Sequence, residues 1–252
     1  MAKKILFLLV VFLTNIIQGI TGFAGTMLAM PPSVMLVGFD TAKPILNALG
    51  LFSGIYIVAA NRKSVNKKEF LKIVAVMSLG MLAGFALRSV LAGRERVMYI
   101  MLGVVVILTA AWGIYKSFLR KGGEHGHGKA VSALLLVSAG VTHGMFVCGG
   151  PLLVSYMTGK VSDKQEFRAT LSACWIVLNG IILADDIRTG LWNKDLLLLF
   201  GISAAILFAA MFIGSLLCKK MSRGLFMKIT YVLLIVSGAL LFIKKFDRLA
   251  RM

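Results

Sequence analysis

Charged side chains are scarce in this 252-residue chain, where Asp, Glu, Lys and Arg together make up only 15% of the residues. A soluble domain of this size could not cover its surface with so few of them. Hydrophobic residues make up 59%, and the mean hydropathy is +0.90. This composition excludes an ordinary water-soluble domain and is typical of a chain that lies in lipid.

Acidic residues are rarer still, and none lies in the middle of an apolar run. Asp40, Asp185, Asp186 and Asp195 all fall near the ends of such runs. A relay of carboxylates that carries protons across a membrane is therefore not expected. Coupling through His143, Asp185 or the charge of a substrate is the expected alternative.

Motifs of metal sites and enzymes are also missing. The three cysteines, Cys148, Cys174 and Cys218, lack metal-ligand spacing, and no HExxH, GxSxG or paired intramembrane carboxylates occur. His125 and His127 stand in a glycine-rich stretch and are read as part of a solvated tether. We therefore expect no metal, no cofactor and no enzymatic activity.

Positive charge is abundant, with 28 Lys and Arg against 10 acidic residues. These cations cluster between hydrophobic runs, as at Arg62 to Lys68 and at Lys219 to Arg223. Cations in that position orient helices and contact anionic lipid head groups. The expected partner is the lipid bilayer, and nucleic acid is not expected.

The hydrophobic runs are long enough to cross a membrane, which takes about 20 residues per helix. Eight segments are predicted: 5–37, 41–60, 70–91, 97–118, 130–157, 167–184, 195–217 and 225–243. The sequence therefore predicts an all-α, polytopic protein of the cytoplasmic (inner) membrane.

The two halves of the chain resemble each other. An offset of 125 residues places Gly19 on Gly144 and Gly25 on Gly150, and it carries Lys43 onto Arg168. A fixed offset of this kind indicates a duplicated bundle with a pseudo-two-fold axis. We predict a first four-segment repeat at 1–121, a flexible linker at 122–129 and a second repeat at 130–252.

The opening segment of each repeat is too long for a single crossing, because 33 helical residues from Ile5 to Val37 would span about 50 Å. Glycines offer places to end a helix, and prolines suit the first turn of a new one. We expect a break at Gly19 to Gly25, followed by Pro31 and Pro32, and another at Gly140 to Pro151.

These two glycine-rich corners are the predicted substrate site. Backbone that leaves a helix at membrane depth is tolerated only where protein buries it or where it lines a cavity. The candidate binding residues are Gly19, Thr21, Gly22, Gly25, Thr26, Asn47, Thr142, His143, Gly144, Cys148, Gly149, Gly150 and Ser172. The alternative is that the glycines only allow helices to pack closely.

Three basic residues have two interpretations each. Lys43 and Arg168 occupy equivalent positions after the corners, where they either attract anions to the mouth of the site or reach the interface as ordinary flanking cations. His143 lies in an apolar run beside the second corner. It either takes part in binding or proton coupling or forms a neutral hydrogen bond between helices.

Two topologies fit the segments. Eight simple crossings would make the repeats parallel, whereas two re-entrant opening hairpins would make them inverted. The distribution of Lys and Arg does not separate these arrangements, although both place the loop at Arg62 to Lys72 in the cytoplasm. We favour inverted repeats, because a folded-back pair of short helices accommodates the long opening segments better.

The corners also resemble a known motif. Gly19-Ile-Thr-Gly-Phe-Ala-Gly25 with Pro31, and Gly144-Met-Phe-Val-Cys-Gly-Gly-Pro151, are similar to the paired glycine-rich motif of the TauE/SafE sulfite exporter family. The resemblance implies transport of sulfite, sulfonates, thiosulfate or small organic acids. This chain departs from the pattern in having Val147 at the position that corresponds to Gly22, and His143 has no counterpart in the first half.

The expected function is that of a secondary transporter that moves a small anion, with a proton or sodium as a possible coupling ion and a homo-oligomer as a possible assembly. Free amides at the N-termini of the short helices would hold the anion, because glycine leaves them accessible. An anion channel, or a non-transporting assembly or lipid-handling protein, is the alternative.

Overall fold

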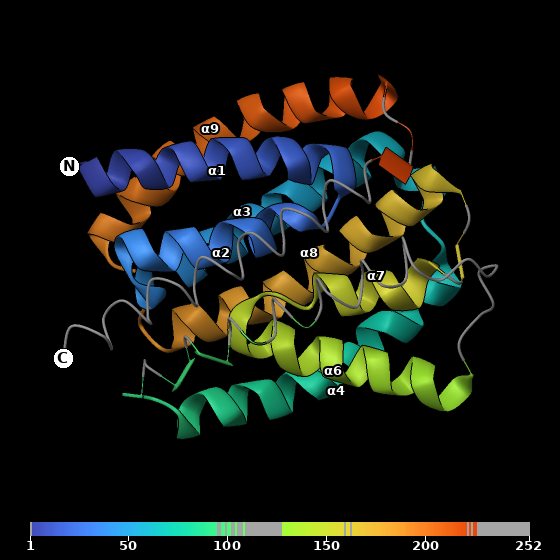
Figure 1. Ribbon diagram of the computed structural model, residues 1–252, viewed down its shortest axis with the longest axis horizontal. Helices are drawn as coiled ribbons and strands as arrows, with labels where there is room; N and C mark the ends of the chain where they lie inside the picture. The colour runs from blue at the N-terminus through green and yellow to red at the C-terminus, as the bar shows by residue number, and fades with distance from the viewer. Residues whose placement is uncertain are drawn as a thin grey trace.

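The computed structural model describes residues 2–94, 128–158, 160, 161 and 163–220, with isolated residues at 97–108 and 222–225. Within these residues all regular structure is helical (Figure 1). Most residues of the predicted segments 97–118 and 225–243, and most of the linker 122–129, lie outside the described residues. Six of the described helices are long and apolar enough to cross a membrane.

The first half contains four α-helices. They are α1 (Ala2–Thr21), α2 (Ala24–Val37), α3 (Phe39–Asn61) and α4 (Lys67–Val90), with a short 3₁₀ turn at Arg62–Ser64 between the last two. The predicted opening segment is thus two helices that meet at Gly22 and Phe23.

The second half repeats this order. It contains α6 (Lys129–Phe146), α7 (Gly150–Thr158), α8 (Lys164–Arg188) and α9 (Lys194–Lys220). The predicted segment 130–157 is likewise two helices, separated by Val147 to Gly149.

The prolines open a helix in the second half of the chain but not in the first half. Pro151 is the second residue of α7, where its missing N–H costs no hydrogen bond. Pro31 and Pro32 instead lie inside α2, which begins seven residues earlier at Ala24. The prediction that this proline pair opens the second helix was wrong, because Gly22 alone, with φ of 82°, turns the chain.

Helices of the two halves pack against each other in three pairs: α1 with α9, α4 with α6, and α3 with α8. Figure 1 shows α1 and α9 along one edge of the bundle, α4 and α6 along the opposite edge, and α3 and α8 between them. The two outer crossings depend on glycine. A Cβ at Gly19 would lie 3.0 Å from Cα of Gly214, and a Cβ at Gly140 would lie 3.0 Å from Cα of Gly80.

The central pair, α3 and α8, runs antiparallel. Lys43, at the start of α3, is ion-paired to Asp186, near the end of α8. Further along, Gly50 lies against Asn179, and Gly54 lies against Ser172. We call this contact between α3 and α8 the α3–α8 seam. The basic loop after α3 therefore lies at the end of the seam opposite to Lys43.

The outer faces of the bundle are apolar. Leucines on α1, α4, α6 and α9 are exposed, with Leu79 and Leu198 each 69% accessible. Water would disfavour so much exposed apolar surface, whereas lipid tails would cover it. The described chain is therefore an all-helical, multi-pass membrane protein.

The glycine crossings allow a first prediction. A Gly140→Ala substitution should lower the unfolding free energy by about 1–3 kcal/mol, because the added methyl group collides with the backbone of α4. Thermal unfolding in detergent measures the change. The control is Gly201→Ala on α9, where no atom lies within 4 Å of the new Cβ. Equal melting temperatures for both variants would contradict the close crossing.

Candidate functional site

At the first corner, nearby side chains of α1 accept hydrogen bonds from the backbone amides at the start of α2. Gly22 has φ of 82°, and a side chain there would also meet Arg168 and Ser172 of α8. The Thr21 hydroxyl accepts hydrogen bonds from the amides of Phe23 and Ala24, each at 3.0 Å. The Gln18 side-chain oxygen accepts from the Gly25 amide at 2.7 Å. Two side chains of α1 thus cap the start of α2.

The second corner is different. Val147 adopts the left-handed conformation, with φ of 57°, and its amide donates to His143 O at 2.8 Å. The amides of the next three residues, Cys148, Gly149 and Gly150, have no hydrogen-bond partner among the described residues. They precede or begin α7, so they carry the positive end of its dipole. This corner leaves donors available where the first corner does not.

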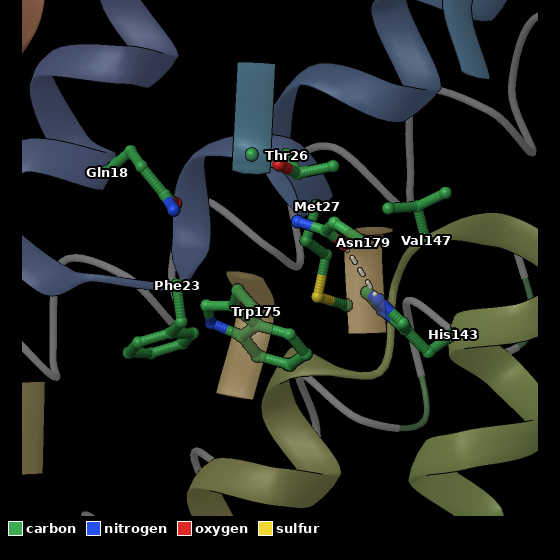
Figure 2. Close-up of a pocket in the computed structure, with 10 residues that line it drawn as sticks. Gln18, Phe23, Thr26, Met27, His143, Val147, Trp175 and Asn179 are labelled. Carbon is green, nitrogen blue, oxygen red and sulfur yellow. Dashed lines mark hydrogen bonds between the residues drawn. The ribbon is translucent and has the colours of Figure 1, made fainter. Parts of the chain in front are cut away.

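A small cavity lies between the two corners. Its walls come from both halves, and the lining residues are Gln18, Phe23, Thr26, Met27, Gly50, His143, Val147, Gly150, Trp175 and Asn179. Figure 2 shows the labelled side chains reaching this space from α1 and α2, from α6 and its corner, and, for Trp175 and Asn179, from α8. The cavity volume of about 10 Å³ holds roughly one water molecule.

His143 closes one wall of the cavity. Its Nε2 lies 2.9 Å from Asn179 Oδ1, the bond drawn in Figure 2. An amide oxygen only accepts, so Nε2 carries the proton and a neutral His143 has a bare Nδ1. That Nδ1 has no partner among the described residues. The ring also stacks on Trp175, with centroids 4.9 Å apart.

Two further polar groups near the cavity are buried and unpaired within the described part of the chain. Trp175 lines the cavity, and its indole N–H, which can only donate, has no acceptor there. Asn47 donates to Asn179 O at 3.0 Å, but its own Oδ1 is unpaired. Buried polar groups without partners cost free energy unless a ligand or water satisfies them.

The only ion pairs among the described residues form one cluster at an end of the α3–α8 seam. Lys43 is paired with Asp186, and Arg88 donates to Asp185 Oδ2 at 2.7 Å. Lys43 and Asp186 are 1% and 0% exposed. Lys43 is thus buried between helices, and the interpretation of it as a flanking cation at the interface was wrong.

Arg168 lies near the first corner. Its guanidinium donates to Gly19 O and to Ser215 Oγ at 3.3 Å, and no carboxylate of the described residues pairs with it. Lys43 and Arg168, which the sequence predicts to be equivalent, therefore have different surroundings.

The predicted site residues divide into three groups. Thr26, His143 and Gly150 line the cavity. Around it, Thr21, Gly22, Gly25, Asn47, Cys148, Gly149 and Ser172 form the corners and the adjoining seam. By contrast, Gly19 and Gly144 lie at crossings with α9 and α4, and Thr142 donates back to its own helix at Ser138 O and Ala139 O.

Seven lining residues were not predicted as binding residues: Gln18, Phe23, Met27, Gly50, Val147, Trp175 and Asn179. Gln18 and Asn179 are polar residues inside apolar runs, which is itself a sign of an interior position. Gly50 and Trp175 give no such sign, because both types are common in membrane helices.

These features define a class first: a multi-pass helical membrane protein with broken helices around a buried polar cavity, an arrangement found in transporters. A family model for the sulfite exporter TauE/SafE matches residues 7–241. The chain therefore belongs to the TauE/SafE family, a family of membrane transporters rather than enzymes. No curated protein and no solved structure matches it.

The internal cap of the first corner can be tested with Thr21→Val. This isosteric change removes the hydroxyl acceptor of the buried amides of Phe23 and Ala24 and should cost about 1–3 kcal/mol of stability. Thermal unfolding in detergent reports the loss. Thr142→Val is the matched control, since its hydroxyl bonds only to carbonyls already used in a helix, and a loss equal to that of Thr21→Val would contradict the capping role.

Proposed function

We propose that the protein is a secondary carrier of the inner membrane that moves a small anion, of the sulfite, sulfonate, thiosulfate or small organic acid class, through the cavity between the two corners. The observation that carries the proposal is a set of unpaired donors around that cavity. They are the indole N–H of Trp175 and the amides of Cys148, Gly149 and Gly150.

The charge of the lining supports an anion rather than a cation. Asp and Glu are absent from the described lining residues, and the second corner has three backbone amides without a partner among the described residues. The start of α7 adds the positive end of a helix dipole, which favours an anion near Gly150. Because the first corner caps its own amides, the anion binds mainly at the second.

His143 is the proposed coupling group. Protonation of its bare Nδ1 would create a second donor and a positive charge beside the anion, and stacking on Trp175 would stabilise that cation. An anion that binds with the proton would carry it along. Coupling through His143 needs no carboxylate inside the membrane.

Inverted repeats would give this carrier two alternating entrances. In the correspondence read from the sequence, α3 matches α8, and these two helices run antiparallel in the bundle. Equivalent helices that run in opposite directions are expected for repeats related by an axis in the membrane plane. The outer helix pairs agree with this symmetry. The offset relates α1 to α6 and α9 to α4, so the pair α1–α9 corresponds to the pair α6–α4.

The size of the cavity favours a carrier over a channel. Room for about one water molecule is too little for sulfite, with its four heavy atoms, and most of the lining side chains are buried. A channel would need a continuous wet path, whereas a carrier passes through closed states between its two open ones.

Gly150 provides the direct test of this function. Gly150→Leu should fill the cavity and reduce sulfite flux into proteoliposomes to the level of protein-free vesicles, with insertion unchanged. Gly150→Ala is the control, because its Cβ would lie 3.4 Å from the Phe23 ring, an ordinary contact. Normal flux through the leucine variant would rule out this cavity as the path.

The coupling role predicts an effect of pH. Gln at position 143 keeps an amide that can bond Asn179 but cannot take up a proton. His143→Gln should therefore abolish the pH dependence of flux measured with thiosulfate, an anion that, unlike sulfite, does not itself take up a proton near neutral pH. The double variant His125→Gln/His127→Gln removes the other two histidines and should retain it. Unchanged pH dependence in His143→Gln would eliminate the proposed coupling.

A further inference from the structure

Lys43 and Arg88 approach the same carboxylate, that of Asp186, at one end of the α3–α8 seam. We propose that these two cations form a second anion-binding site, here named the terminal site, which the Asp186 carboxylate occupies until a transported anion displaces it. The proposal rests on the transport function given above and identifies where the anion enters or leaves the cavity.

The contacts of Asp186 are incomplete. Lys43 Nζ binds one carboxylate oxygen, Oδ1, and Arg88 Nη1 stands 3.7 Å from the same oxygen. The other oxygen, Oδ2, is buried and has no hydrogen-bond partner among the residues described, and neither has Arg88 Nη1. An oxyanion such as sulfite offers three oxygens and would engage both cations at once, which the carboxylate does not.

The buried charge of Lys43 depends on Asp186. Lys43 and Arg88 face the two carboxylates of Asp185 and Asp186, and the third cation of the cluster, Arg188, is 79% exposed, so water solvates its charge. Among the described residues Asp186 is the only ion-pair partner of Lys43. A fully buried lysine that loses this partner is unfavourable, and a bound anion would replace it.

The terminal site lies on the same seam as the cavity. Lys43 and Gly50 are seven residues apart on α3, and Asp186 and Asn179 are seven apart on α8, which corresponds to about 10 Å along either helix. Asn47 bridges the interval by its bond to Asn179 O, and Asn179 bonds His143. Polar groups therefore continue from the terminal site to the cavity.

The seam also gives the terminal site an orientation. The basic loop Arg62 to Lys72 is at the other end of α3, and the positive-inside rule places such a loop in the cytoplasm. The terminal site thus belongs to the external half of the path. When an anion takes the place of Asp186, the pair that joins α3 to α8 is broken and this end of the seam is free to open.

A comparison of Asp186→Asn with the double variant Lys43→Met/Asp186→Asn tests the proposal on the purified full chain. Both lack the competing carboxylate and differ only in the cation. Thermal unfolding is followed against sulfite at constant ionic strength, with chloride as the balancing anion. Asp186→Asn should be less stable than wild type without sulfite and should be stabilised at about tenfold lower sulfite concentration. The double variant should lose this gain.

Two controls carry the same charge changes outside the cluster. Asp163→Asn alters the exposed cap of α8 at the other end of the helix, and Lys194→Met alters an exposed lysine at the start of α9. Both should respond to sulfite as wild type does. A purely structural ion pair predicts equal sulfite responses in Asp186→Asn and the double variant, and that result would overturn the terminal site. So would an Asp186→Asn protein that sulfite does not stabilise.

The outcome separates this site from the main function. If wild type transports sulfite, Gly150→Leu does not, and the Asp186 variants respond alike, only the terminal site is refuted. If wild type transports no anion while Asp186→Asn is still stabilised by sulfite in a Lys43-dependent way, the terminal site stands and the proposed carrier is refuted.

Discussion

The need to satisfy backbone amides at membrane depth governs this bundle. A helix that stops inside a low-dielectric interior leaves several N–H groups without partners, at a cost of several kcal/mol each in hydrocarbon. The first corner meets this need internally, through Thr21 and Gln18. The second corner leaves three consecutive amides unpaired among the described residues, and the last of these residues, Gly150, lines the cavity. The asymmetry of the corners gives the proposed site its preference for anions.

Close packing elsewhere makes this arrangement possible. Glycines at the α1–α9 and α4–α6 crossings let backbones approach without side chains between them. The outer pairs therefore hold both corners against the central α3–α8 seam. Along that seam the polar residues are concentrated, from the His143–Asn179 bond to the buried pair of Lys43 and Asp186. Closely packed outer helix pairs on both sides of a polar seam would allow the seam to open at one end at a time.

Much of the fold was predictable from the sequence, because apolar run length sets helix length in lipid. The helical class and the breaks near Gly22 and before Pro151 are confirmed, whereas the helix-opening role of Pro31 and Pro32 is wrong. Local preferences do not reveal which side chains will cap a corner, so the role of Thr21 as an acceptor for the amides of Phe23 and Ala24 was not predicted. The burial of Lys43 escaped prediction too, since its partner Asp186 is 143 residues away.

A map of the purified protein with bound sulfite, or with its heavier analogue selenite, tests the central claim most directly. Density for the anion is expected beside Gly150, within about 3 Å of the amides that follow Val147 and within reach of Trp175. The cavity should be larger than in the closed state. An anion bound only at the lipid interface, with these amides paired to other protein groups, would contradict the proposed site.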